Sequence, residues 1–259
     1  MKKIATTFAL LAFALGLAAT PSMAASLVFD TFTYANGNLV PNGGWANYSG
    51  AATDIQVASN RATGFGPNAN DDHILFAAQP VTAKTYACFD VIIPAVAAQP
   101  KPIYFAELKD AGAANLVSRV YVLPLATGGW TFGISHSSTS ATVGVAPWTA
   151  PLSFDVSYHL VINYDPVNKT STLWVNPVDE FSPSVSITNP AIAALAVAGF
   201  GLRQSASAST LPTSPLYSGS ADWGFSVDNL GVGVTFSDAC EIPTPAHPAT
   251  WGSVKGLYR

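Results

Sequence analysis

The chain has 259 residues, of which 49% are hydrophobic and only 10% are charged. An average soluble domain carries roughly 25% charged residues, so this chain is poor in charge. The formal net charge is −4 and the 11 basic residues are scattered, which argues against a nucleic-acid-binding surface. High hydrophobicity with a small net charge also argues against a disordered chain.

The first 24 residues have the pattern of a secretory signal peptide. Met1-Lys2-Lys3 is positively charged, and an uncharged apolar run follows from Ile4 to Ala19. Ser22-Met23-Ala24 then supplies the small residues that precede a cleavage site. The alternative is a membrane anchor, but the run is short of the roughly 20 residues that a spanning helix needs. We therefore expect a secreted or cell-surface protein without a transmembrane segment.

From residue 26 onward, short apolar segments alternate with turn residues, and helical periodicity is almost absent. Segments of this kind predict strands. In chain order, we expect strands at residues 26–32, 55–57, 74–76, 85–93, 103–108, 116–122, 130–135, 158–164, 170–175, 197–203 and 225–236. Turns or loops are expected at residues 36–38, 41–44, 64–72 and 165–169.

One expected strand shows how its two faces differ. Leu160, Ile162 and Tyr164 share one face, whereas His159 and Val161 point to the opposite side. The second face is half apolar, so we expect it to be curved or partly covered.

The number and spacing of the strands define the fold class. Eleven or twelve short strands in about 210 residues predict an all-β, two-sheet antiparallel sandwich or barrel. No linker divides the chain before residue 240, so residues 25–240 are expected to form one domain. Residues 241–259 are a proline-rich spacer and a short C-terminal tail. The tail is interpreted either as a sorting or docking signal or as a frayed end.

Cys88 and Cys240 are the two cysteines of the chain, and in an exported protein they suggest one disulfide. Cys88 is early in the expected strand 85–93, and Cys240 follows the expected strand 225–236. If these strands are antiparallel neighbours, the two cysteines come close enough to bridge. The bridge would close a loop of about 150 residues, worth on the order of 4–5 kcal/mol. The alternative is two unrelated buried thiols.

Several segments together resemble secreted bacterial domains of the laminin-G-like, concanavalin A-like jelly-roll family. The segments that carry the resemblance are 29–39, 43–45, 104–110, 170–177, 200–204 and 227–234. They span residues 26–238, nearly the whole chain after the signal peptide. The resemblance implies two curved antiparallel sheets in which the last strand lies beside residues 85–93. It also implies glycan or protein binding, or a structural role.

Aromatic residues are the best indication of a ligand-binding surface. Trp45, Tyr48 and Trp148 lie in loop-like sequence and are expected to be exposed. Aromatic rings stack on the apolar faces of sugars, so these residues are candidate ligand contacts. The alternative for each tryptophan is a place in the core.

Asp71 and Asp72 form the densest cluster of hard ligands, with His73 beside them. Calcium takes six to eight oxygen ligands, so this segment is a candidate calcium site and Ca²⁺ the one cofactor considered. The alternative is a solvated polar loop.

The sequence does not favour an enzyme. Glycosidases of the jelly-roll type carry a Glu-x-Asp-x-x-Glu strand pattern that is absent here, and no Gly-x-Ser-x-Gly elbow is present. We therefore expect a non-enzymatic module that binds carbohydrate or an extracellular protein, with a role such as cell adhesion. The first alternative is a self-associating structural subunit of a matrix or filament, since few charges remain to protect sheet edges. The second alternative is a polysaccharide-cleaving enzyme.

Overall fold

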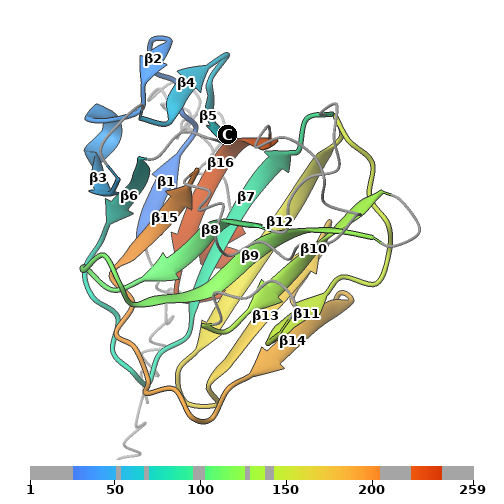
Figure 1. The fold of residues 1–259 in the computed structure, drawn as a ribbon. Coiled ribbons are helices and arrows are strands. Elements are labelled where there is room, and N and C mark those ends of the chain that lie inside the picture. Colours follow the sequence, from blue (N-terminus) through green and yellow to red (C-terminus); the bar gives the residue numbers. More distant parts are fainter. Residues whose placement is uncertain are drawn as a thin grey trace, which may run out of the picture.

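The computed structural model describes residues 26–50, 54–66, 70–95, 103–125, 129–137, 143–204 and 223–240. Within these residues the chain forms two antiparallel sheets that lie face to face (Figure 1). The predicted signal peptide, residues 1–24, and the predicted tail, residues 241–259, lie outside the described residues. In the described part, no helix is long and apolar enough to cross a membrane.

The first sheet has nine strands in the order β14–β13–β12–β7–β16–β5–β4–β2, and β1 also pairs with β16. Its strands are β1 (Val28–Asp30), β2 (Gly37–Asn38), β4 (Gln56–Ala58), β5 (Arg61–Gly66), β7 (Thr85–Ile92), β12 (Ser157–Asp165), β13 (Thr170–Val175), β14 (Ser184–Thr188) and β16 (Trp223–Gly233). The long central strands β7 and β16 hold this sheet together.

The second sheet has seven strands in the order β11–β10–β9–β8–β15–β6–β3. Its strands are β3 (Trp45–Ser49), β6 (Asp71–Leu75), β8 (Ile103–Lys109), β9 (Leu116–Pro124), β10 (Trp130–Ser135), β11 (Val145–Pro147) and β15 (Gly199–Arg203). A 3₁₀ turn, η1 (Asn42–Gly44), and one short helix, α1 (Phe236–Cys240), complete the elements of the described residues.

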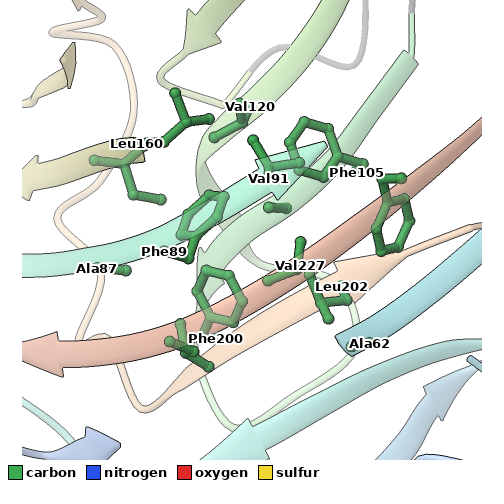
Figure 2. Packing of buried hydrophobic residues seen from close by; sticks show 14 of the residues in the cluster. Ala62, Ala87, Phe89, Val91, Phe105, Val120, Leu160, Phe200, Leu202 and Val227 are labelled. Carbon is green, nitrogen blue, oxygen red and sulfur yellow. The ribbon is translucent and has the colours of Figure 1, made fainter. Parts of the chain in front are cut away.

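Alternate residues of both sheets fill the space between them (Figure 2). Phe89 of β7 packs edge-on against Phe105 of β8, with ring centroids 6.4 Å apart, and against Phe200 of β15 at 5.5 Å. All three rings are fully buried, so they join the two sheets into one hydrophobic core. These observations confirm the predicted all-β, two-sheet antiparallel jelly-roll sandwich.

The outward face of the nine-stranded sheet is partly covered, as the alternation in β12 predicted. Val161 and Trp174 lie on this face and belong to a second, smaller apolar cluster. Phe236 of α1 packs on it, 5.6 Å from the ring of Trp174 and 6.3 Å from that of Tyr86. The helix therefore shields the half-apolar outer side of β7, β12 and β13.

The predicted disulfide is present. β7 and β16 are antiparallel neighbours, and Cys88 of β7 is bonded to Cys240 at the end of α1, with a Cα–Cα distance of 5.3 Å. The pairing of the last strand with residues 85–93, which the resemblance implied, is likewise observed.

One expected loop was wrong in part. Residues 64–72 were expected to form a loop, but Arg61–Gly66 is β5 and β6 begins at Asp71. Gly64 favoured the prediction of a loop, because glycine is common in turns. In the structure a Cβ at this position would collide with the ring of Phe225 on the neighbouring strand. The glycine allows close approach of a side chain and does not mark a turn.

Candidate functional site

Polar and aromatic side chains gather on the outward face of the seven-stranded sheet, opposite the core. They come from five adjacent strands, and we call them the polar face. Its members are Tyr48, Asp71, His73, Tyr104, Glu107, Lys109, Arg119, Tyr121 and Arg203. Tyr48, Tyr104 and Arg203 are half-buried, while the other six are buried.

Glu107 lies at the centre of the polar face and has no exposed surface. The hydroxyl of Tyr48 donates a hydrogen bond to Glu107 Oε1, whereas Oε2 is buried without a hydrogen-bond partner. Burial raises the pKa of the Glu107 carboxyl to about 7, although the Tyr48 hydrogen bond opposes this shift. The pairing residue on β15 is Gly201, where a Cβ would collide with Glu107 Oε1. The glycine therefore makes room for the carboxyl.

Lys109 and His73 lie beside this pair. Lys109 Nζ donates to His73 Nδ1 at 2.9 Å and lies 4.7 Å from the centroid of the Tyr48 ring. The His73 ring stacks on Tyr48 with centroids 5.2 Å apart. Burial, followed by the charge of Lys109, lowers the pKa of His73 to about 4, so the imidazole is neutral at neutral pH. A neutral ring is the form that accepts the lysine hydrogen bond.

Tyr104 has two guanidinium groups close to its ring. Arg203 is 4.4 Å and Arg119 is 5.0 Å from the centroid of its ring, which is the geometry of cation–π contacts. Arg203 Nε is 3.7 Å from Asp71 Oδ2, and Tyr121 packs against Tyr104 with ring centroids 5.4 Å apart. The aromatic ring and the arginines therefore hold one another in a fixed arrangement.

The polar face has an excess of positive charge in a chain whose net charge is negative. Lys109, Arg119 and Arg203 carry three positive charges. They are opposed by Asp71 and by Glu107, and Glu107 is only partly ionised near pH 7 because of its raised pKa. The positively charged side chains of this face therefore outnumber its ionised carboxylates.

Of the three predicted aromatic contacts, the structure places Tyr48 on the polar face and the two tryptophans elsewhere. Tyr48 was expected in an exposed loop, but it lies in β3 and is half-buried. Trp45 was expected to be exposed, but it is 2% exposed, lies in β3 and donates its indole N–H to Asp30 Oδ2 at 2.7 Å. This expectation is corrected, because Trp45 points into the core and its ring is not available at the surface. Trp148 follows β11 and packs half-buried against the core cluster, with its backbone N–H bonded to Phe132 O.

The predicted pair of metal ligands is divided between two faces. Asp71 pairs with Arg203 and points outward, whereas Asp72 pairs with the core residue Leu202 and points inward. Asp72 Oδ2 accepts the backbone N–H of Ile55 at 3.1 Å. Burial raises the pKa of Asp72 to about 7. The two carboxyls do not face the same side of the strand, and calcium binding in this segment stays a prediction.

The sequence pattern alone does not group Tyr104, Glu107, Lys109, Arg119 and Arg203 as a site. The available signal was the presence of charged residues inside otherwise apolar strands, such as Glu107 and Lys109 in IYFAELK. Bulges between β8 and β9 disturb the simple alternation, so the sequence did not show which of these side chains share a face.

No family profile and no curated protein sequence matches the chain. Solved structures match its fold. A sialidase gives a TM-score of 0.53 at 13% identity over 83% of this chain, which spans only 19% of the sialidase chain. An endo-1,3-beta-glucanase from Streptomyces sioyaensis gives 0.53 at 14% identity, covering 83% of this chain and 97% of the other. The CBM2 module of the evolved Dit protein of Lactobacillus casei BL23 phage J-1 gives 0.50 at 12% identity, covering 81% and 95%.

The fold and these matches define the class of the protein. It is an antiparallel β-sandwich of the jelly-roll type, and its structural neighbours include carbohydrate-active and carbohydrate-binding proteins. Identities of this size establish the fold alone.

Proposed function

We propose that this chain is a secreted, non-enzymatic carbohydrate-binding module of the laminin-G-like or concanavalin A-like type. Its saccharide lies on the polar face, with Tyr104 and Tyr48 as the aromatic contacts. The observation that carries this proposal is the half-buried ring of Tyr104, with the guanidinium groups of Arg119 and Arg203 at 5.0 and 4.4 Å from its centroid.

The chemistry of these side chains suits a sugar. Tyrosine presents a rigid ring with an apolar body and a polar tip, which can contact both the C–H surface and the hydroxyls of a sugar ring. Arg203 donates in a planar fork that matches carboxylate geometry. The excess of cations favours a saccharide that carries carboxylate or sulfate groups.

The buried charges of the polar face also support a binding role. A buried ionisable group destabilises the fold unless it is paired, and apolar residues at the same positions are often as stable or more so. Glu107 and Lys109 both have pKa values displaced by burial, Glu107 upward and Lys109 downward. Perturbed groups of this kind gather at functional sites more often than elsewhere.

A screen of neutral and acidic glycans, followed by titration calorimetry with the best ligand, tests the proposal. We expect Tyr104→Ala and Arg203→Ala each to weaken binding at least about tenfold, since each removes a contact with the sugar. Phe181→Ala is the control, because this ring is 95% exposed and lies in the turn between β13 and β14. Equal affinity in all four proteins would place the saccharide elsewhere, and no bound glycan would end the proposal.

A second candidate is polysaccharide cleavage, favoured by one observation. The Tyr48 hydroxyl bonds to a Glu107 carboxyl with a pKa of about 7, next to the neutral ring of His73. A carboxyl near neutral pKa beside a hydroxyl can take up and return a proton. To test this candidate, each glycan that binds is incubated with wild type and with Tyr48→Phe, and the release of cleavage products is measured. Cleavage by wild type that is lost in Tyr48→Phe would show an enzyme and would contradict the non-enzymatic module.

A further inference from the structure

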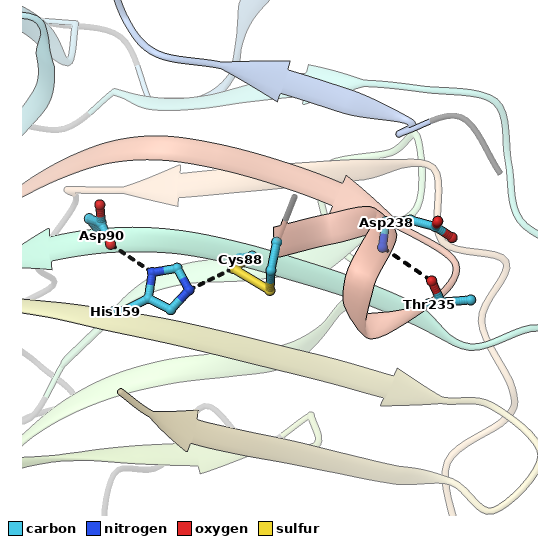
Figure 3. The surroundings of a disulfide bond; sticks show 6 residues. Cys88, Asp90, His159, Thr235 and Asp238 are labelled. Carbon is cyan, nitrogen blue, oxygen red and sulfur yellow. Dashed lines mark hydrogen bonds and ion pairs between the residues drawn. A yellow bond between two sulfur atoms is a disulfide. The ribbon is translucent and has the colours of Figure 1, made fainter. Parts of the chain in front are cut away.

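The outward face of the nine-stranded sheet carries a line of three reactive groups beside the disulfide (Figure 3). Cys88 Sγ is 3.1 Å from His159 Nε2, and His159 Nδ1 is 2.7 Å from Asp90 Oδ1. Strand register explains the alignment, because Asp90 pairs with His159 across β7 and β12 and Cys88 lies two residues before Asp90 on the same face. The line runs from sulfur to imidazole to carboxylate.

The carboxylate end of this line is fixed by its neighbours. Asn229 Nδ2 donates to Asp90 Oδ2 at 2.8 Å. The hydrogen bond from His159 holds the pKa of Asp90 below its ordinary value. An ionised Asp90 keeps a proton on His159 Nδ1, which leaves the lone pair of Nε2 directed at the sulfur. Charged groups near the line include Arg61 of β5 and Asp228 of β16, which form an ion pair at 3.3 Å, and Asp238 of α1, which Figure 3 draws beside the disulfide.

The two cysteines differ in their exposure to solvent. Cys88 is 2% exposed, whereas Cys240 is partly exposed and lines a cavity of about 430 Å³. The cavity lies between α1 and the turn after β13, and its lining includes Phe236 and Val178. Its volume is in the range of small-molecule sites. A small reagent can therefore approach the bridge from the side of Cys240.

The charge of the cavity also indicates what enters it. Its charged lining residues are Asp179 and Glu180, both exposed carboxylates. Complementary charge favours a cation over an anion at such a site.

We propose that Cys88–Cys240 is an exchangeable disulfide, and that a small cationic thiol in this cavity attacks the sulfur of Cys240. The incoming thiol loses its proton to solvent and its sulfur bonds to Cys240 Sγ. The bond between Cys240 and Cys88 breaks, and Cys88 leaves with the electron pair as a thiolate. His159 Nε2 takes up a proton from solvent, so the products are a mixed disulfide on Cys240 and a Cys88 thiolate beside an imidazolium.

His159 and Asp90 act as positioning residues in this exchange. A thiolate that is stabilised by a neighbouring imidazolium leaves faster, because the rate of exchange rises as the leaving thiol becomes more acidic. The carboxylate of Asp90 orients the ring, as in other arrangements of nucleophile, base and acid. This proposal is independent of carbohydrate binding.

The unmutated protein gives the first test. It is treated with cysteamine or with 3-mercaptopropionate, and the rate at which the thiol adduct forms is measured. Each rate is divided by the rate at which the same thiol reacts with a short reference disulfide. The adducts are mapped by mass spectrometry. We expect a single adduct on Cys240, formed several-fold faster with cysteamine, and loss of this preference in Asp179→Asn. An adduct on Cys88, or no adduct under conditions that modify the reference, would overturn the proposal.

Variants give the second test. We expect His159→Gln and Asp90→Asn to slow formation of the adduct by about tenfold. After reduction, alkylation of Cys88 should also require a higher pH in both variants than in wild type. Thr172→Ala, on the same face of the adjacent strand β13, is the matched control and should behave as wild type. Unchanged rates and pH profiles in folded His159→Gln and Asp90→Asn would refute the role of the imidazole.

Discussion

At the scale of single residues, the unusual feature is a set of ionisable groups buried on the polar face. Glu107 is fully buried, accepts a hydrogen bond from Tyr48 and retains one oxygen without a hydrogen-bond partner. Such a carboxyl is easier to bury protonated than ionised. The polar face should therefore make the stability of the protein depend on pH.

The sign of this dependence follows from the direction of the shift. The pKa of Glu107 is raised from 4.5 to about 7, so the folded protein holds this proton more tightly than the unfolded chain does. Its contribution is complete at low pH and is lost as the pH rises through about 7. Between about pH 5 and about pH 8 we expect wild type to lose on the order of 2–3 kcal/mol of unfolding free energy relative to Glu107→Gln. Urea unfolding of both proteins at both pH values measures this difference. An equal change in unfolding free energy between the two pH values in wild type and Glu107→Gln would contradict it.

At the scale of elements, β7 is the strand on which most of the architecture depends. It pairs with both β12 and β16. Its inward residues meet the other sheet, and its outward residues Tyr86 and Cys88 lie under α1. The glycines of β16 permit this contact, because a Cβ at Gly231 would collide with the carbonyl of Ala239 in α1.

The core position of β7 gives a direct test. Phe89→Ala leaves a cavity between the rings of Phe105 and Phe200, and we expect a loss of about 3–5 kcal/mol in unfolding free energy. Phe89→Leu, which keeps more of the volume, should lose markedly less. Denaturant unfolding of the three proteins measures both effects; equal stability of the alanine and leucine variants would show that the core collapses around the missing ring.

At the scale of the whole molecule, one covalent bond joins distant parts of the sandwich. Cys88 and Cys240 are separated by 152 residues, so the disulfide ties α1 to the central strand β7. Self-association as a matrix or filament subunit stays a prediction, to be measured by light scattering against concentration.

Removing the disulfide should be costly. In the chain-entropy view, closing a loop of this length restricts the unfolded chain and stabilises the fold by about 5 kcal/mol. We expect the double variant Cys88→Ala, Cys240→Ala to lose a comparable amount in urea unfolding at neutral pH, because its unfolded chain is no longer restricted. A loss below about 1 kcal/mol would mean that the native packing of α1 alone holds this end of the chain.

The sequence by itself determined the all-β class, most of the long strands, and the disulfide. These depend on local features: the alternation in residues 158–164, the hairpin of residues 103–122 and the positions of two cysteines beside two strands. It did not identify β3, β5, β11, β14 or the single-turn helix α1. Gly64 in β5 resembled a turn signal, and α1 takes its support from Tyr86 and Trp174, which are distant in the chain.

Only the tertiary structure decided where chemistry is concentrated. Tyr48, His73, Glu107 and Arg203 come from four strands that are far apart in the chain, and strand order and bulges bring them to one face. The same holds for Cys88, Asp90 and His159, which the register of β7 against β12 aligns. A pattern along the chain predicts the side of its own strand on which a residue lies. The residues next to it across the sheet are determined by the pairing of distant segments. That pairing brings the side chains of a site together.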